Sequence, residues 1–557
     1  MEKREDLNSV LPYLPLLVRS STLFWPSKVV EALKSMAKGP EHSRVNSGEV
    51  LSVAICDIRS SLSLFEPLAP FALNVYALFF DDLISRAEST KWFGEVVPAL
   101  ANFLLKLLSL LENHYQNVDD FLGKYGIKTG LRVLGPQEAG IVLLSQVSLY
   151  LGYHFLNVAF RELIGALLAC SFFCLFLVTN RGANHLPTIN FDELFASLYE
   201  SNSENQENKI KCIVHYFERI SSCMPVGSVS FERKVLPLDH HPLFISYPYA
   251  DAWSKSVIPL CPFEAYSLGS IEDHSTDTLQ VDFANRYIGG GALHRGCAQI
   301  NPELIAGMLF FPSMADNEAI EIVGEERFSD YNGYASSFCF SGDHVDKRNV
   351  DVLSRRKTRI IAIDALCWPG TKQYALKYLL RETNKALCGF IDQSKFGGYE
   401  RLFPDMGPHE AKDKDNISRN NFSLHEASST GFETNEGISV NLMLRNSDQK
   451  SCQFLRHKES PGIVTGNWGC GSFGGDPELK AIIQWLAASQ ALRPFISYYT
   501  CGMKALYNQG QVTQWILTHE WTVGDLWNMM VEYSSQRLKG EMNLGFFAWL
   551  LPSLTCH

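Results

Sequence analysis

The sequence predicts an α/β domain preceded by an all-helical accessory region. Helical periodicity runs through residues 25–230, whereas from about Val235 short β-type runs alternate with helices. Two glycine-rich loops, each after a strand-like run, lie in the second part. Strands alternating with helices are typical of a sheet covered by helices. We therefore expect a helical domain at residues 1–230 and an α/β domain at residues 231–545.

Composition excludes several classes of protein. The chain has 557 residues, of which 46% are hydrophobic, enough for a large core. Its 49 basic and 60 acidic residues give a net charge of −11, which argues against direct sequence-specific binding of nucleic acid. A polyanionic ligand would therefore need local backbone N–H donors. The 14 cysteines show neither CxxC pairs nor zinc-ligand spacing, so we expect a reduced intracellular protein without a metal.

Three local patterns resemble functional signals but favour structural roles. The uncharged run 163–178 is shorter than the ~20 residues that span a bilayer, so we predict a buried helix and no membrane partner. Residues 239–241, Asp-His-His, predict a loop, because neighbouring side chains of an extended chain point to opposite sides. The basic run 355–357 is typical of a solvated face. The charged N-terminal residues predict no secretory signal.

Residues 281–299, VDFANRYIGGGALHRGCAQ, join a strand to a triple glycine. Leu279, Val281 and Phe283 alternate with polar residues, which predicts a strand with one buried face. The glycines at 289–291 lack a Cβ, so the backbone can adopt positive φ and approach a ligand closely. Successive N–H groups in such a loop can bind an anion. A plain turn is the alternative on this evidence alone.

A second glycine-rich run, residues 466–475, follows an apolar pair and leads into a helix. Asp476 suits the N-cap and Pro477 suits the first helical position. A strand, a glycine loop and a helix start form an arrangement that suits a phosphate. The run lacks the Lys-Ser/Thr ending of a Walker loop, so hydrolysis of a nucleoside triphosphate is not indicated. The two loops together predict a diphosphate held by backbone.

The other elements follow from periodicity and turn residues. We predict strands at 319–323, 337–341, 359–365 and 495–500, and helices at 99–111, 207–220, 374–390, 476–491 and within 502–539, where Thr522 is a possible N-cap. Residues 391–462 are polar and poor in aliphatic residues, which predicts a disordered loop interrupting the α/β domain.

These motifs resemble the poly(ADP-ribose) glycohydrolases, and the plant enzymes in particular. The resemblance rests on VDFAN at 281–285, GGG at 289–291, Gln299 and INPELIAG at 300–307. Further matches are YNGYA at 331–335, IIAIDAL at 360–366, NKALCGF at 384–390, the loop 466–476 and TVGD at 522–525. It implies a macrodomain-like mixed sheet flanked by helices, with an N-terminal all-helical accessory domain.

The resemblance also implies a function and a site. The reaction would be hydrolysis of the ribose-ribose O-glycosidic bond of poly(ADP-ribose), releasing ADP-ribose, without a cofactor. Partners would be poly(ADP-ribose) and ADP-ribosylated proteins, and we expect a monomer in nucleus and cytoplasm that acts in the DNA damage response. Carried over by position, Asp282 would be catalytic and, with Asn285, anchor the site near the scissile ribose. The substrate-binding residues would be Ile271 and Glu272 at the adenine, Asn285 near the scissile ribose, the glycines Gly289, Gly290 and Gly291, Gln299 in contact with the substrate, and Tyr331 and Tyr334 lining the pocket. Asn467, Trp468, Gly469, Cys470, Gly471 and Ser472 would wrap the diphosphate, with Phe473 packed over it.

One departure concerns catalysis directly. In the family two glutamates and an IRFM-like or IRFL-like stretch follow the glutamine, whereas here Gln299 is followed directly by Ile300. These glutamates supply the acid and the negative charge that the reaction needs. For Glu303 we predict a structural role instead. Asn301 can cap a helix and Pro302 fits its first position, which places Glu303 in the first turn. The rival class is a module that binds ADP-ribose chains without cutting them, and a third is an inactive misfolded variant.

A second departure lies in the helical domain. Residues 147–161, VSLYLGYHFLNVAFR, form an insertion relative to the family. Either a helix lengthens by about 22 Å at this point or the segment bulges out as a loop. The two departures together indicate a variant transcript or an imperfect gene model, and reading the transcript across both junctions would distinguish them.

Overall fold

The computed structural model describes residues 4–19, 22–120, 131, 155–183, 186–201, 204–238, 245–274, 277–296, 301–309, 311–333, 335–392 and 460–552. The chain forms two compact units. Unit 1 comprises Met1–Val235, Ser270–Pro369 and Trp468–Gly475, and unit 2 comprises Leu236–Gly269, Gly370–Asn467 and Asp476–His557.

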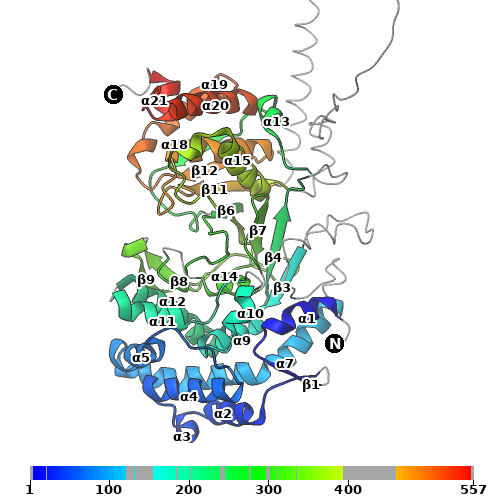
Figure 1. Cartoon of the computed structure of the whole chain (residues 1–557), viewed down its shortest axis with the longest axis vertical. Helices are drawn as coiled ribbons and strands as arrows, with labels where there is room; N and C mark the ends of the chain where they lie inside the picture. The colour runs from blue at the N-terminus through cyan, green and yellow to red at the C-terminus, as the bar shows by residue number, and fades with distance from the viewer. Residues whose placement is uncertain are drawn as a thin grey trace, which may run out of the picture. The chain divides into compact units, whose positions relative to one another are not determined.

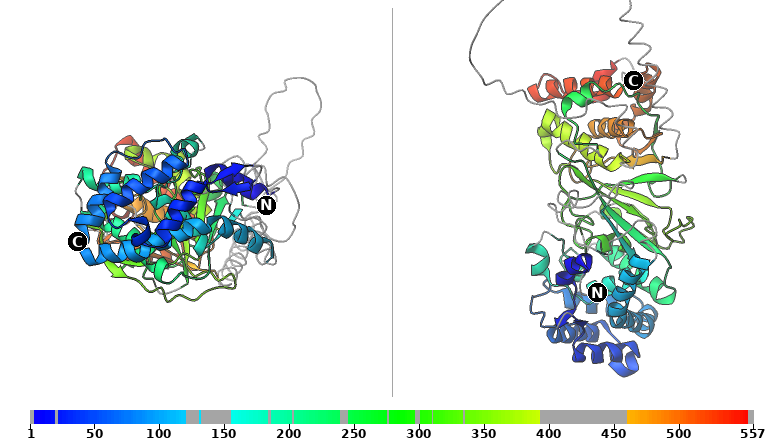
Figure 2. Two further views of the ribbon diagram at one scale, coloured as in Figure 1. Left: turned by 90° about the horizontal axis from the view of Figure 1, so that it is seen from below. Right: turned by 90° about the vertical axis from the view of Figure 1, so that its right-hand side faces the viewer.

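Helices build the N-terminal part of unit 1, because its apolar residues recur at helical spacing. In α7 (Val97–Asp120), Leu100, Leu104, Leu107 and Leu111 form one fully buried stripe. Helix α7 packs against α2 and α9, and α4 packs against α5 (Figure 1). Figure 2 shows these helices from two further sides. The other α-helices in the described residues of this part are α1 (Glu5–Val10), α2 (Ser27–Ala37), α3 (Pro40–Ser43), α4 (Gly48–Ser61), α5 (Ala72–Ala77), α6 (Arg86–Lys91), α9 (Arg161–Phe172), α10 (Val178–Ala183), α11 (Asp192–Ser201) and α12 (Glu204–Ser222).

An aromatic cluster forms the centre of this helical part. Tyr76 and Phe195 stack with ring centroids 4.0 Å apart, and Phe80 and Trp92 stack at 4.9 Å. Phe172 of α9 packs edge-on against Trp92 at 5.7 Å. Buried aromatic pairs stabilise a core by about 0.5–1.5 kcal/mol each beyond the area they bury. The cluster therefore fixes α5, α9 and α11 against one another.

Two apolar runs of this part could be mistaken for membrane segments. Among the described residues one helical run, Arg86–Asn117, is long and apolar enough to cross a membrane by length and composition. Its buried leucine stripe on α7 belongs to the core. The run predicted as one buried helix at 163–178 is shorter, since α9 ends at Phe172 and Cys174 has a φ of 55°. Both Cys170 and Cys174 are buried.

The sheet of unit 1 is mixed. Its strands run in the order β3 (Phe155–Phe160), β4 (Ser228–Val235), β7 (Glu318–Val323), β10 (Arg359–Ala362) and β6 (Thr278–Asp282). Only β10 and β6 pair in parallel, with Ala362 opposite Asp282. The described residues of this unit also contain a hairpin of β8 (Ser329–Asn332) and β9 (Cys339–Asp343) and a short pair of β1 (Leu17–Arg19) and β2 (Thr22–Phe24).

The predicted insertion is partly described, and it contains a strand. Residues 147–154 lie outside the described part, whereas β3 pairs antiparallel with β4 from Phe155 opposite Arg233 to Phe160 opposite Ser228. The expectation of a longer helix or a bulging loop is therefore wrong for residues 155–160. Backbone pairing at the sheet edge explains the result, because a strand's partner is distant in sequence and gives no local signal. The predicted all-helical region also ends early, since β4 begins at Ser228.

Unit 2 contains three parallel strands covered by helices. Strand β12 (Ile496–Tyr499) lies between β11 (Gly462–Gly466) and β5 (Phe263–Tyr266). Helix α18 (Pro477–Gln490) is capped by Asp476, whose side chain accepts the N–H groups of Glu478 and Leu479 at 3.0 and 3.2 Å. The described part of unit 2 also contains α13 (Ala250–Ser254), α15 (Leu376–Phe390), α19 (Gln509–Thr518), α20 (Val523–Lys539) and α21 (Phe546–Leu550).

Several predicted boundaries and surface roles differ from the structure. The strand predicted at 337–341 is β9, which begins at Cys339 after a 3₁₀ turn at Ala335–Ser337. The predicted loop 391–462 overlaps the first residue of β11, and its residues 393–459 lie outside the described part, as do residues 239–241. The basic run is solvated at Lys357, which is exposed, but its two arginines are paired. Arg355 pairs with Asp351 at 2.7 Å and Arg356 with Glu326 at 3.3 Å, and both arginines are half-buried.

Candidate active site

Asp282 ends strand β6 at the carboxyl edge of the unit 1 sheet. Its backbone carbonyl accepts the N–H of Ile363 at 3.2 Å, which fixes the strand end against the segment after β10. The side chain is half-buried and has no hydrogen-bond partner among the described residues. Burial, with a smaller contribution from the charge of Glu272, raises the pKa of Asp282 to about 6. An aspartate with this pKa is partly protonated near neutral pH, as a general acid requires.

Glu272 is held by two side chains on other elements. The hydroxyl of Tyr331, on β8, donates to Glu272 Oε1 at 2.9 Å, and Arg348 donates to the carbonyl oxygen of Glu272 at 2.7 Å. The guanidinium of Arg327 lies 4.6 Å from the ring centroid of Tyr331. Burial, followed by the charge of Glu272, raises the pKa of Tyr331, so its proton remains in place to donate. The structure thus brings together predicted site residues on segments far apart in the chain.

The first glycine loop needs its glycines for steric reasons. Gly289 and Gly290 have φ angles of 75° and 48°. A Cβ at Gly289 would lie 2.5 Å from Met308 Sδ, and a Cβ at Gly290 would lie 2.8 Å from Asn285 Cβ. Within the loop, the N–H of Gly290 donates to the backbone carbonyl oxygen of Tyr287 at 2.9 Å, and the N–H of Ala292 donates to that of Gly289 at 2.8 Å. These two N–H groups are already bonded within the turn, so fewer N–H groups of this loop are available to bind an anion than the sequence predicts.

Asn285 and Lys209 brace this loop from opposite ends. The side chain of Asn285 accepts the N–H of Tyr287 at 3.1 Å, so its carbonyl oxygen shapes the turn. Lys209, on α12, is buried and donates to the carbonyl oxygens of His294, at 3.2 Å, and Gly296. Sequence reasoning did not single out Lys209. The available signal was a lysine on the buried face of a predicted helix, which requires acceptors from elsewhere in the chain.

The second glycine loop combines an anchored base with an exposed tip. Gly469 and Gly474 have φ angles of 73° and 68°. The N–H of Gly475 donates to Gly469 at 2.9 Å and that of Gly474 to Gly471 at 3.0 Å, which closes the loop on itself. Gly471 and Ser472 are exposed at its tip, and Phe473 is half-buried.

Trp468 anchors this loop through its side chain. It is fully buried, and its indole N–H donates to the carbonyl oxygen of Ile363 at 3.0 Å. The buried ring therefore cannot contact a ligand directly, and only the backbone of Trp468 is left to bind one. Asn467, in unit 2, donates to the carbonyl oxygen of Thr500 at 2.9 Å and accepts from Tyr498 at 3.2 Å. Its amide is thus committed to both neighbours.

Glu303 has the predicted structural role in the first turn of a helix, and it also forms a buried ion pair. Asn301 caps α14 (Pro302–Gly307) by accepting the N–H of Glu303 at 2.9 Å, with Pro302 at the first position. The Glu303 carboxylate is fully buried, pairs with Arg161 at 2.8 Å and accepts the N–H of Glu326 at 2.7 Å. A carboxylate with these partners is not free to give a proton to a substrate.

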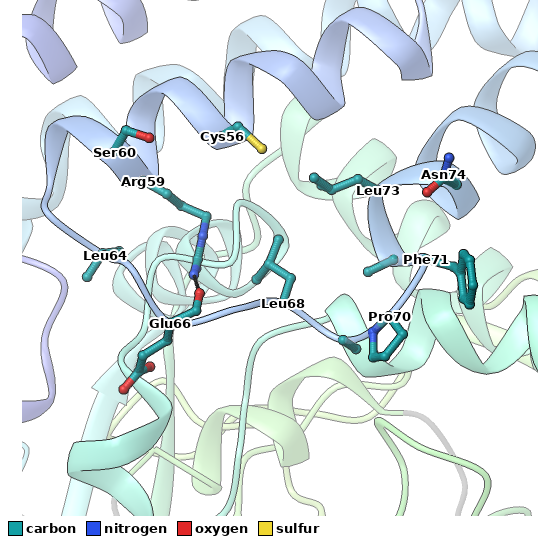
Figure 3. Close-up of a pocket in the computed structure, with 12 residues that line it drawn as sticks. Cys56, Arg59, Ser60, Leu64, Glu66, Leu68, Pro70, Phe71, Leu73 and Asn74 are labelled. Carbon is teal, nitrogen blue, oxygen red and sulfur yellow. Dashed lines mark hydrogen bonds between the residues drawn. The ribbon is translucent and has the colours of Figure 1, made fainter.

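Gln299 and Tyr334, two predicted site residues, lie outside the described residues. Within the described ranges, no group of three or more His, Cys, Asp or Glu side chains could hold a metal. A pocket of about 370 Å³ lies in the helical part of unit 1, with Cys56, Arg59 and Phe71 among its lining residues (Figure 3). Arg59 reaches across it to the backbone carbonyl of Glu66 at 2.6 Å. None of its lining residues is a predicted site residue.

Comparison with known proteins identifies the family of this site. Residues 250–508 match the macro domain fold of poly(ADP-ribose) glycohydrolase, and residues 84–233 match its helical domain. The chain belongs to the poly(ADP-ribose) glycohydrolase family. It is 56% identical over 566 residues to "Poly(ADP-ribose) glycohydrolase 1" of Arabidopsis thaliana, covering 100% of this chain and 98% of that protein. It is 50% identical over 563 residues to "Probable poly(ADP-ribose) glycohydrolase 2" of the same plant, covering 100% of both chains.

A more distant relative shows how far the similarity extends. "Poly(ADP-ribose) glycohydrolase 1" of Caenorhabditis elegans is 29% identical over 319 residues, which cover 54% of this chain and 32% of that protein. The macrodomain-like mixed sheet and the helical N-terminal domain expected from the sequence are confirmed by the family match.

Proposed function

We propose that this chain is a glycosidase that hydrolyses the ribose-ribose bonds of poly(ADP-ribose) and releases ADP-ribose. Membership of the family supports the substrate and the reaction. The observation that carries the chemistry is Asp282, a half-buried carboxyl at the end of β6 whose pKa is raised to about 6. Such a group can protonate a leaving ribose oxygen at neutral pH.

The other groups of the site bind the adenine end and the diphosphate of the ligand. Glu272, oriented by Tyr331 and Arg348, places a second carboxylate near Asp282 and contacts the adenine end of the ligand. The exposed tip at Gly471 and Ser472 offers backbone to the diphosphate, since N–H donors of a glycine-rich loop suit negative charge. No step of this scheme requires a cofactor.

The absence of the glutamate pair after Gln299 should lower the rate of hydrolysis. The reaction needs an acid and a negative charge near an oxocarbenium-like transition state. Asp282 is the carboxyl that the described part of the site supplies at the scissile ribose, because Glu272 is assigned to the adenine end and Glu303 is committed to Arg161. We therefore propose hydrolysis at a rate well below that of a chain carrying the pair.

A hydrolysis assay run beside an ADP-ribose titration tests the function. We expect release of ADP-ribose from poly(ADP-ribose), with a kcat that falls as pH rises through about 6, because only protonated Asp282 donates. Asp282→Asn should lower kcat by about 10²- to 10⁴-fold with unchanged ADP-ribose affinity. Binding of ADP-ribose without any hydrolysis would instead support a binding module.

Partners and location are further proposals that rest on the family alone. We propose that the chain acts as a monomer on ADP-ribosylated proteins in nucleus and cytoplasm, during the DNA damage response. Light scattering of the purified protein tests the first point. Imaging of a fluorescent fusion before and after DNA damage tests the others.

A further inference from the structure

Trp368 is an exposed aromatic residue with an unusual backbone conformation. Its side chain is 76% exposed, and its φ angle is 49°, in the left-handed region that residues other than glycine rarely adopt. A large aromatic side chain held out to solvent on a strained backbone needs a compensating interaction. Strain of this kind often marks a position with a function.

The backbone of Trp368 is tied to the second glycine loop. Its N–H donates to the carbonyl oxygen of Phe473 at 3.0 Å. A Cβ placed on Gly474 would lie 3.7 Å from Cε3 of the indole, so the ring lies beside this glycine. The indole therefore stands next to the exposed tip at Gly471 and Ser472 that we assign to the diphosphate.

The same segment also reaches the catalytic carboxyl. Ile363, five residues before Trp368 in the chain, donates its N–H to the carbonyl oxygen of Asp282 at 3.2 Å. The carbonyl oxygen of Ile363 accepts the indole N–H of Trp468, the anchor of the loop, at 3.0 Å. Residues 363–368 thus connect the end of β6 to the rim of the glycine loop, and Trp368 is the exposed end of that connection.

We propose that Trp368 is a subsite that stacks on the adenine of a neighbouring ADP-ribose unit of the polymer. This inference rests on the proposed function and adds a contact to a second unit. The adenine of the unit in the site is assigned to Ile271 and Glu272, and Glu272 is already held by Tyr331 and Arg348. Every repeat of the chain carries another purine, and an indole face is a general stacking surface for bases.

Binding measurements with monomer and oligomer test the proposal. Wild type, Trp368→Ala and Trp368→Tyr are titrated with ADP-ribose and, on ice before hydrolysis is measurable, with short purified oligomers of ADP-ribose. We expect Trp368→Ala to weaken oligomer binding by at least about fivefold and to leave ADP-ribose binding unchanged. Trp368→Tyr should restore most of the oligomer affinity. Phe65→Ala, at an aromatic residue that is 82% exposed in the helical part, should change neither.

Each outcome separates this inference from the function on which it rests. Failure of the wild type to bind ADP-ribose overturns the proposed function. ADP-ribose binding with equal oligomer affinity in wild type and Trp368→Ala overturns the stacking subsite alone. An equal loss of both affinities in Trp368→Ala also overturns it, because Trp368 would then only support the loop at Phe473. Trp368→Gly, which suits the left-handed backbone, repeats the test if the alanine variant does not fold.

Discussion

Arg161 and Glu303 form a buried ion pair, with 2.8 Å between Nε and Oε1, across 142 positions of sequence. Burial disfavours the charge on Arg161, but Glu303 together with the charges of Glu326 and Glu325 outweighs it and raises the pKa of the guanidinium. Arg161 is the last residue of the predicted insertion, and Glu303 lies in the first helical turn after the absent glutamate stretch. The two departures predicted from the sequence therefore meet in one contact.

Replacing Glu303 should affect stability. Glu303→Gln leaves Arg161 buried without an opposing carboxylate at that position, and breaking such a pair typically costs about 3–5 kcal/mol. We expect a urea unfolding curve to show a loss near the lower limit, because the amide oxygen can still accept the N–H of Glu326. The matched control is Glu207→Gln, which breaks an ion pair on the surface of α12 and should cost less than about 1 kcal/mol.

The hydrolysis rate of folded Glu303→Gln completes this test. The rate should match that of the parent chain at a temperature where both are folded. A rate loss with unchanged stability would identify Glu303 as a substitute acid and contradict the structural role.

Bulk at the tip of the second glycine loop should weaken ADP-ribose binding. Gly471 is exposed at this tip, so Gly471→Leu would put a side chain where backbone amides face the diphosphate. We expect the Kd for ADP-ribose, measured by calorimetry, to rise by at least about tenfold, equivalent to roughly 1.4 kcal/mol. Gly94→Leu is the control, because a Cβ at Gly94 meets nothing within 4 Å. Equal affinities of Gly471→Leu and wild type would remove the diphosphate role from the loop.

The parts of the fold that sequence could predict are those encoded locally. Asp476 and Thr522 were predicted as N-caps, and both caps are present. A cap depends on residues two or three positions away, so its signal lies within one turn. The glycines with positive φ at 289 and 290 were predictable for the same reason.

Contacts between distant segments could not be predicted. The burial of Trp468 depends on the carbonyl oxygen of Ile363, 105 positions away, so the sequence alone could not separate a loop anchor from a ligand contact. Lys209 binds carbonyls 85 and 87 positions later in the chain. Strand β3 forms through its pairing with β4, which local propensity does not reveal. The site residues could be predicted from the resemblance of their motifs to those of the family more than from any geometry that the sequence implies.

Removing the Asp282 carboxyl should stabilise the fold while it lowers activity. Its pKa is raised in the folded state to about 6, against about 3.9 in an unfolded chain. Between these two values the folded state binds more protons than the unfolded state, so its stability falls as pH rises through this window. Asp282→Asn lacks this penalty and should be more stable than wild type by up to about 3 kcal/mol above pH ~6, with little difference below pH ~4.

Urea unfolding over this pH range measures the effect of Asp282→Asn. The matched control is Asp57→Asn, at an exposed aspartate of α4, which should not show the same pH-dependent gain. A constant difference between Asp282→Asn and wild type at all pH values would contradict the raised pKa.

Restoring the family's glutamate-bearing stretch between Gln299 and Ile300 should raise hydrolysis. Loss of a general acid costs about 10²- to 10⁴-fold, and loss of the adjacent negative charge adds to it. Glu303 cannot replace the pair, since its carboxylate is held by Arg161 and by the N–H of Glu326. We expect the restored chain to hydrolyse poly(ADP-ribose) at least about a thousandfold faster than this one.

The restored chain needs a control that separates carboxyl chemistry from local backbone register. Removing six residues from a regular helix would turn the residues after the deletion by about 120° off their original face, so the insertion alone changes the geometry near Gln299. A version of the same insert with both glutamates replaced by glutamine restores length without acid, and it should remain as slow as the present chain. A fast glutamine version would assign the defect to register, whereas equal rates for the present and the glutamate-restored chains would show that Asp282 suffices without the pair. Circular dichroism and ADP-ribose titration of all three proteins ensure that folded, ligand-competent chains are compared.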